Sequence, residues 1–447
     1  MTDLRTRFRT FDELHAPELW HEAERRAAVT QPRAVRLNQW VFITVVLLLA
    51  LLAGAVALIG SRTIRLPLLV ETTSMPSTPA NLATPALTPL VATAPTWTAT
   101  GSMIETRSRY TATLLANGKV LVAGGGSIDG GEAVASAELY DPATGAWTST
   151  GAMLEARGEG YTATLLPDGK VLVVGGYDRG GLASAEVYDP NSGKWTATGS
   201  MDGVRFYHTA TLLPDGTVLV AGGEVRNNRV FPSAELYDPR TGSWTATGRM
   251  RGAFSPETAT LLLDGTVLTV GGIDGRELAY AELYDPPTGT WSVTGSLSGA
   301  HAGRATLLPD GKVLVAGGAS ATKVVEPDIG GPAPGALTLA SAELYDPRTG
   351  TWTVTGSMTE ARLGYTATLL ADGTVLVAGG HSNDTSGTRL LASAELYDPT
   401  TGSWALTAGM LAARTGHTAT LLPNGTVLVI GGSDSALVEL YVPGKGS

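Results

Sequence analysis

Arginines recur at one position of a repeated sequence unit, and they are the side chains best suited to bind a ligand. The motif is Met, three further residues and Arg. A ring of guanidinium groups on an otherwise acidic chain would suit carboxylates or other anionic groups, which accept paired hydrogen bonds. The competing interpretation is structural, with each Arg donating to carbonyl groups of neighbouring loops. The candidate ligand-binding residues are Arg107, Arg157, Arg205, Arg362 and Arg414, and two further units have Phe254 and His301 at this position.

Two of these arginines are followed three residues later by a histidine. His208 follows Arg205 and His417 follows Arg414, so both histidines join the candidate ligand-binding set. An Arg with a His or Glu could also take part in proton transfer. Tyrosines stand close to the same point in the repeat, and they could either form a rim for a sugar or pack between repeats. They are Tyr110, Tyr161, Tyr207 and Tyr365.

Composition excludes several kinds of site. The 447-residue chain has no Cys, which excludes disulfides, thiolate metal sites and cysteine nucleophiles. Its 41 acidic side chains outnumber 31 basic ones, and an acidic body disfavours nucleic acid as a partner. We predict no catalytic residue, no metal site and no cofactor, and a binding function is favoured over an enzymatic one.

The N-terminal part of the chain is predicted to hold a membrane anchor. Residues 41–60 are uncharged and apolar, and as a helix they would span about 30 Å of bilayer. A cleaved secretory signal is the alternative, because Ala55-Val56-Ala57 has the small-residue pattern of a cleavage site. More arginines precede this stretch than closely follow it, so residues 1–40 are predicted to be cytoplasmic and the rest extracytoplasmic, in a single pass. Residues 61–96, rich in Pro, Thr and Ala, are predicted to be a disordered linker.

Residues 97–447 consist of a sequence repeat of about 50 residues. In each unit an apolar run ends in Gly-Gly, and a Tyr and a Trp then follow at a fixed spacing. Four strands are predicted per unit. Turns such as Pro167-Asp168-Gly169 join the first two strands, and turns such as Asp141 to Gly145 join the last two. A recurrent Glu in the third strand is predicted to pair within its own unit. The repeated tryptophans are Trp97, Trp147, Trp195, Trp244, Trp291, Trp352 and Trp404.

This pattern resembles the kelch repeat family, in which each repeat forms one four-stranded blade of a β-propeller. The resemblance therefore implies an all-β, seven-bladed kelch propeller. The last unit ends after Glu439-Leu440-Tyr441 without a Trp strand, whereas the strand around Trp97 has no unit before it. These two incomplete ends are complementary, so we predict that the N-terminal strand completes the last blade and closes the ring.

The function predicted from these features is a cell-envelope binding module, displayed outside the cell membrane. Its ligand would be a glycan, a wall component or a surface protein, held at one face of the propeller. Kelch-related oxidases use copper with a Tyr-Cys crosslink, and the absence of Cys excludes that subclass here. Two alternatives stay open: an epimerase-like enzyme acting on carbohydrate, and a transmembrane sensor that signals through residues 1–40.

Overall fold

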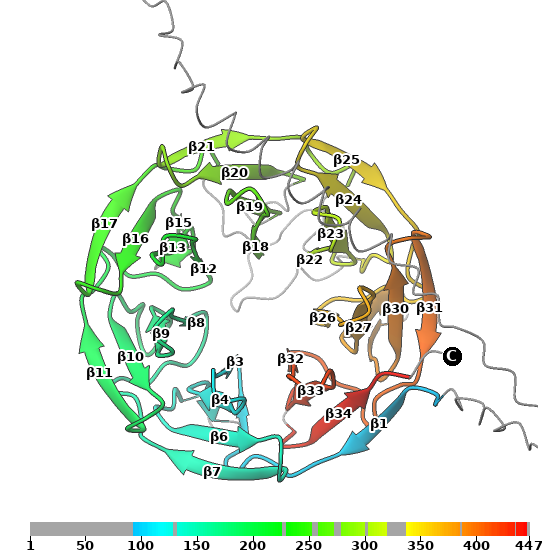
Figure 1. The fold of residues 1–447 in the computed structure, drawn as a ribbon, viewed down its shortest axis with the longest axis horizontal. Helices are drawn as coiled ribbons and strands as arrows, with labels where there is room; N and C mark the ends of the chain where they lie inside the picture. Colours follow the sequence, from blue (N-terminus) through cyan, green and yellow to red (C-terminus); the bar gives the residue numbers. More distant parts are fainter. Residues whose placement is uncertain are drawn as a thin grey trace, which may run out of the picture. The chain divides into compact units, whose positions relative to one another are not determined.

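The computed structural model describes residues 93–127, 132–225, 229–252, 258–271, 279–299, 303–319, 337–384, 387–433 and 435–444. The predicted transmembrane segment 41–60 and nearly all of the predicted linker lie outside these residues. Across the described ranges no helix has both the length and the apolar character needed to cross a bilayer. The described residues form an all-β ring, seen from one end in Figure 1.

Seven four-stranded antiparallel sheets form this ring among the described residues, which confirms the predicted seven-bladed propeller. We number the blades from 1 to 7 along the chain. Their innermost strands are β3 (Thr111–Leu114), β8 (Thr162–Leu165), β12 (Thr209–Leu212), β18 (Thr258–Leu261), β22 (Arg304–Leu307), β26 (Thr366–Leu369) and β32 (Thr418–Leu421).

The second strand of each blade is buried along its whole length, and it is entirely apolar except for Thr269 in blade 4. Its alternate side chains face opposite neighbours: Val120 and Val122 pack with blade 7, whereas Leu121 and Ala123 pack with blade 2. The hydrophobic core therefore lies between blades, which explains an uninterrupted apolar run in the sequence. These strands are β4 (Val120–Ala123), β9 (Val171–Val174), β13 (Val218–Ala221), β19 (Val267–Val270), β23 (Val313–Ala316), β27 (Val375–Ala378) and β33 (Val427–Ile430).

The third and outermost strands carry the Tyr and Trp of the repeat, directly paired in register, as Tyr140 with Trp147 in blade 1. The third strands are β6 (Ala137–Asp141), β10 (Ala185–Asp189), β16 (Ala234–Asp238), β20 (Ala281–Asp285), β24 (Ala342–Asp346), β30 (Ala394–Asp398) and β34 (Val438–Val442). The outermost strands are β7 (Ala146–Thr150), β11 (Lys194–Thr198), β17 (Ser243–Thr247), β21 (Thr290–Val293), β25 (Thr351–Val354), β31 (Ser403–Thr407) and β1 (Thr96–Ala99).

The two predicted hairpins of each blade lie on one face of the ring, which we call the turn face. In blade 1 the amide of Gly145 donates to the Asp141 carbonyl over 2.8 Å, and Gly145 has a φ of 70°. A side chain would be disfavoured in this left-handed conformation, so the sequence uses Gly there.

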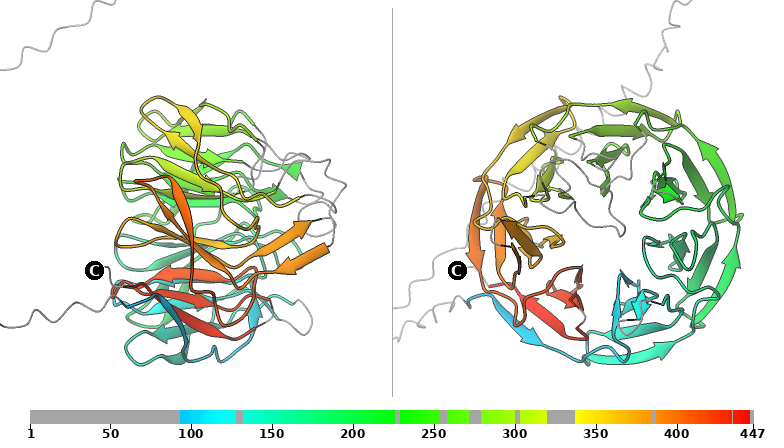
Figure 2. Two further views of the ribbon diagram at one scale, coloured as in Figure 1. Left: turned by 90° about the vertical axis from the view of Figure 1, so that its right-hand side faces the viewer. Right: turned by 180° about the vertical axis from the view of Figure 1, so that it is seen from behind.

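The opposite face, which we call the loop face, carries the segments that join second to third strands and that lead into each new blade. Three short two-stranded sheets also form there: β2 (Arg107–Ser108) with β5 (Gly126–Ser127), β14 (Glu224–Val225) with β15 (Arg229–Val230), and β28 (His381–Asp384) with β29 (Gly387–Leu390). The β28–β29 hairpin projects from this face in the left view of Figure 2.

The ring is closed by the N-terminal strand, as the sequence predicts. β1 pairs antiparallel with β34 and supplies the outermost strand of blade 7. Trp97 packs on Tyr441 with ring centroids 5.1 Å apart, and its indole N–H donates to the Ala408 carbonyl of blade 6 over 2.6 Å. The same indole bond links Trp147 of blade 1 to Gly101 over 2.7 Å, so the seam repeats the contacts found between other blades.

Candidate functional site

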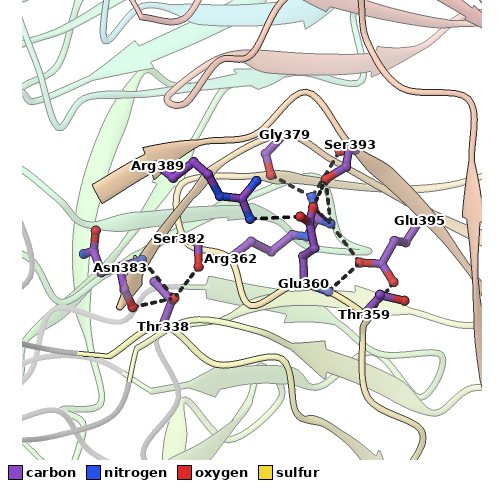
Figure 3. Close-up of polar contacts among 10 residues, drawn as sticks. All are labelled: Thr338, Thr359, Glu360, Arg362, Gly379, Ser382, Asn383, Arg389, Ser393 and Glu395. Carbon is purple, nitrogen blue, oxygen red and sulfur yellow. Dashed lines mark hydrogen bonds and ion pairs between the residues drawn. The ribbon is translucent and has the colours of Figure 1, made fainter. Parts of the chain in front are cut away.

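The five predicted arginines are buried inside the blades rather than exposed at the channel mouth. Their exposed fractions lie between 0% and 4%. Arg362 shows the shared arrangement (Figure 3): one guanidinium nitrogen donates to the carbonyls of Gly379 and Ser393, and the other donates to Glu395 over 2.8 Å. Arg107, Arg157, Arg205 and Arg414 repeat this pattern with Glu138, Glu186, Glu235 and Glu439.

These pairs, which we call the Arg–Glu braces, hold the segment that enters each of these five blades. The carboxylate of Glu395 also accepts the backbone N–H groups of Thr359 and Glu360 over 2.7 and 3.1 Å. The predicted pairing of the recurrent Glu within its own repeat is therefore confirmed. The guanidinium groups do not form an open ring for an anionic ligand in this structure, because each is already hydrogen-bonded within its blade.

The two predicted histidines are buried between neighbouring blades. Nε2 of His208 lies 2.9 Å from the Thr162 hydroxyl, and Nε2 of His417 lies 3.1 Å from the Thr366 hydroxyl. Burial, helped by the charge of neighbouring arginines, lowers the pKa of both imidazoles to about 3. Both rings are therefore neutral at physiological pH, which removes their capacity to act as cationic ligand-binding groups.

Tyrosines fill the same inter-blade position in other blades. The Tyr161 hydroxyl donates to the Ala123 carbonyl of the preceding blade over 2.5 Å, and Tyr110 makes the same kind of bond to Ile430. Tyr365 bonds the Ala316 carbonyl in blade 5 in the same way. These rings pack between blades, which was one of the two interpretations open from the sequence. Phe254 and His301 lie outside the described residues.

A different group of side chains converges on the loop face of blades 1 to 3. Arg109 enters from blade 1 and Tyr207 from blade 3, and both contact the carboxylate of Glu159 from blade 2. The Arg109 guanidinium forms an ion pair with Glu159 Oε2, and the Tyr207 hydroxyl donates to the same oxygen over 2.9 Å. We call these three residues the Glu159 cluster.

The backbone at the Glu159 cluster departs from the rest of the repeat. Arg109 and Tyr207 have φ angles of 57° and 53°, in the left-handed region that L side chains rarely adopt. The equivalent residues in blades 6 and 7 are Gly364 and Gly416, with φ angles of 66° and 67°. Blades 1 and 3 therefore place large side chains where the repeat favours Gly, at a cost of about 1–3 kcal/mol each.

Glu159 occupies an extra position that the other repeats lack. Blade 2 reads Arg157, Gly158, Glu159, Gly160, Tyr161, one residue longer than Arg362 to Tyr365. The Glu159 carbonyl accepts the amide of Tyr177, and the Gly160 carbonyl accepts the amide of Tyr207 over 2.8 Å. A Cβ on Gly160 would lie 2.6 Å from that Tyr207 nitrogen, so the close approach of blades 2 and 3 requires Gly here.

Aromatic rings flank the Glu159 cluster. Phe206 contacts Tyr207 and Tyr177 edge-on, with ring centroids 5.5 Å apart in both cases. Tyr177 is 38% exposed, and the Arg109 side chain is 56% exposed. The arrangement combines an accessible guanidinium, a fixed carboxylate and aromatic surface on a rigid scaffold, which suits ligand binding more than proton transfer.

Sequence reasoning missed this group because it followed the residues that the repeats share. A signal was present: aligning the repeats with one another shows Arg109 and Tyr207 at a Gly position, and Glu159 as an insertion. A residue that departs from the repeat consensus goes against the local structural preference of its position, and such positions are often functional.

The comparisons with known proteins agree with the fold. The family model for the Kelch motif matches residues 161–202, 205–251, 257–298 and 362–411. The chain is a kelch repeat protein. No curated protein sequence matches it significantly.

Solved structures show the same fold at low sequence identity. This kelch protein superposes on a fungal alcohol oxidase of the AA5 family, in complex with copper, with a TM-score of 0.62 and 20% identity, over 78% of this chain and 77% of that one. It also superposes on the structure of YjhT, with a TM-score of 0.52 and 16% identity, over 69% of this chain and 99% of that one. Within the described part of the kelch protein, no three His, Cys, Asp or Glu side chains come together as a candidate metal site.

Proposed function

We propose that this kelch protein is a binding module that engages a protein partner on the loop face of blades 1 to 3. The observation that carries the proposal is the convergence of Arg109 and Tyr207, both in left-handed conformations, on Glu159. Backbone strain of this kind persists where the surrounding structure compensates for it, and it concentrates at functional sites.

The side chains available at the Glu159 cluster match those that dominate protein interfaces. Arg and Tyr are enriched among interface residues that contribute most of the binding energy, and aromatic residues lose little conformational entropy on binding. The Arg–Glu braces and the inter-blade bonds hold the surrounding loops, so a partner would meet a preformed surface. A glycan that stacks on Tyr177 is a second ligand class for the same surface.

Catalysis has less support than binding. An epimerase-like reaction would need a side chain that exchanges protons with a substrate near neutral pH. His208 and His417 are 5% exposed, and their pKa values near 3 leave them unprotonated.

We also propose that the module is displayed outside the cell membrane by the predicted anchor at residues 41–60. β1 begins and β34 ends on the turn face, because the segment that joins β33 to β34 lies on the loop face. The chain that leads from the predicted anchor therefore enters the propeller at the turn face, opposite the loop face.

Site-specific crosslinking in cells tests the protein-binding proposal. A photoreactive residue at position 177 is expected to capture a partner, and one at Pro347 on the turn face is not. The double variant Arg109→Gly, Tyr207→Gly should lose the capture while its melting temperature stays equal or rises, because Gly relieves the left-handed strain. Equal capture from both positions, or undiminished capture by the double variant, would show that the Glu159 cluster is not the binding site.

A further inference from the structure

Three consecutive blades carry an exposed apolar side chain where the other blades carry polar ones. The position follows the buried Met or Leu of the segment that enters each blade. It is Leu411 in blade 7, Ile104 in blade 1 and Leu154 in blade 2, exposed by 62%, 57% and 62%. The equivalent exposed residues in blades 3 to 6 are Asp202, Arg251, Ser298 and Thr359.

The backbone beneath these three side chains, which we call the apolar row, is fixed by the Arg–Glu braces. The amides of Ile104, Leu154 and Leu411 donate to Glu138, Glu186 and Glu439 over 2.7, 2.6 and 2.7 Å. The braces therefore present the apolar row in a set arrangement on adjacent blades. Single exposed apolar groups are common on protein surfaces, whereas groups of them on a rigid surface are typical of interaction sites.

Two of the three positions also carry surplus negative charge. In blade 1 the guanidinium of Arg107 meets the carboxylates of Glu138 at 2.8 Å and Glu105 at 3.1 Å. In blade 2 Arg157 likewise lies 3.0 Å from Glu186 and 3.8 Å from Glu155. One guanidinium balances one of two carboxylates in each case, and the side chains of Glu105 and Glu155 are 56% and 50% exposed.

Blade 6 has the same pair of carboxylates, but a second arginine balances their negative charge. Glu360 takes the place of Glu105, and it forms a further ion pair with Arg389 over 2.9 Å (Figure 3). The side chain beside Glu360 is the polar Thr359. The unbalanced carboxylates therefore coincide with apolar neighbours in blades 1 and 2, whereas the balanced one has a polar neighbour.

We propose that the apolar row and its two surplus carboxylates bind a cationic amphipathic segment of the partner protein, with apolar side chains on the row and Lys or Arg beside Glu105 and Glu155. This inference rests on the proposed loop-face function and names the chemistry of the partner. Charge complementarity of this kind selects the partner and accelerates association.

Synthetic peptides on the full-length protein test the proposal. Short peptides of Leu with Lys, Leu with Gln and Leu with Glu are compared by fluorescence anisotropy at low and high salt. The Leu-Lys peptide is expected to bind most tightly, and salt should weaken its binding. The triple variant Ile104→Ser, Leu154→Ser, Leu411→Ser should lower its affinity by about tenfold or more.

Matched variants distinguish specific binding at the apolar row from nonspecific hydrophobic binding of the peptides. Val354→Ser with Leu406→Ser removes apolar side chains that are 69% and 62% exposed on outermost strands, and should leave the affinity unchanged. Glu105→Gln with Glu155→Gln should reduce the salt dependence, whereas Glu360→Gln should not. The proposal would be overturned if the apolar-row and outer-strand variants lost equal amounts of peptide affinity. It would also be overturned if the Lys, Gln and Glu peptides bound with equal affinity.

The two proposals fail in distinguishable ways. If crosslinking from position 177 still depends on Arg109 and Tyr207 but the row variants bind the peptides normally, the loop-face function stands and the cationic segment is wrong. If the row variants lose the peptide while crosslinking is independent of the Glu159 cluster, the row is a site of its own.

Discussion

At the residue scale, each Arg–Glu brace combines two charges in a position that water hardly reaches. Glu186 is 2% exposed and Arg157 is fully buried. Removing two charges from water costs desolvation free energy. Hydrogen bonds from the guanidinium to the Gly175 and Ser184 carbonyls, together with the ion pair to the carboxylate, offset that cost. Substituting one partner alone should therefore lower the free energy of unfolding strongly, because the other charge would stay buried and unpaired. This holds even if the intact pair adds little to stability.

We expect Glu186→Ala to lower the free energy of unfolding by about 3–5 kcal/mol, because Arg157 would remain buried without its counter-charge. Urea unfolding followed by tryptophan fluorescence measures the change. The double variant Glu186→Ala, Arg157→Leu should be less destabilised than the single one. Equal losses in the two variants would show that lost packing, rather than an uncompensated charge, causes the effect.

Stability should also fall at acidic pH because of the buried histidines. Burial holds the pKa of His208 and His417 at about 3, below the ordinary value of 6.5 that the unfolded chain would show. Between these values the unfolded state binds protons that the folded state does not, so stability is lost as the pH falls from about 6.5 towards 3. The slope is up to about 1.4 kcal/mol per pH unit for each histidine.

The double variant His208→Tyr, His417→Tyr provides the matched control, since blades 1, 2 and 6 have Tyr110, Tyr161 and Tyr365 at this position. Its melting temperature should depend less on pH than that of the native protein between pH 4 and about 6.5. An unchanged pH profile would mean that other groups control acid unfolding.

At the element scale, the strand that closes the ring should contribute as much as any internal strand. Trp97 is 7% exposed, packs on Tyr441 and donates to the Ala408 carbonyl of the neighbouring blade 6. We expect Trp97→Ala to lower the free energy of unfolding by about 3–5 kcal/mol. It should also promote oligomers, because a loosened β1 uncovers the edge of β34. Chemical denaturation and size-exclusion chromatography measure the two effects.

Val293→Ala is the control for the closing strand, because Val293 lies on the outermost strand of blade 4 and is 44% exposed. This substitution should change stability by less than about 0.5 kcal/mol. A Trp97→Ala variant as stable as the control would mean that closure by β1 adds little to the ring.

The elements could be predicted from the sequence because each is specified locally. Asp141 and Gly145 define a turn within five residues, and the apolar run from Val120 defines a strand buried on both sides. Closure followed from counting strands. Turns, strands and ring closure can be predicted without knowing which side chains contact one another within a blade.

The candidate site could not be predicted in the same way. Spacing shows that Arg362 recurs, but it does not show that the guanidinium points inward to Glu395, which lies 33 residues further along the chain. The Glu159 cluster joins residues 50 and 48 positions apart on three separate blades. Such contacts depend on how neighbouring blades pack, and in the sequence they were indicated only by departures from the repeat: Arg109 and Tyr207 at a Gly position, and the inserted Glu159.

At the scale of the whole molecule, the ring is regular in its scaffold and irregular in its surface. The inter-blade core, the Trp bonds and the second strands repeat from blade to blade. The apolar row covers blades 7, 1 and 2, and the Glu159 cluster covers blades 1 to 3, so these two groups lie on the same side of the loop face. A symmetric scaffold with a one-sided surface would give a partner a single orientation.

The closing strand also determines how the ring would respond to mechanical force. A pull between the chain before residue 93 and a partner on the loop face would enter the ring through β1, which runs from the turn face to the loop face. Its register pairs Thr96 with Val442 and Ala99 with Glu439, so a force along the strand loads every pair at once, in shear. The indole of Trp97 adds a lateral bond to blade 6. The seam between β1 and β34 that closes the ring is thus also the contact that would bear tension.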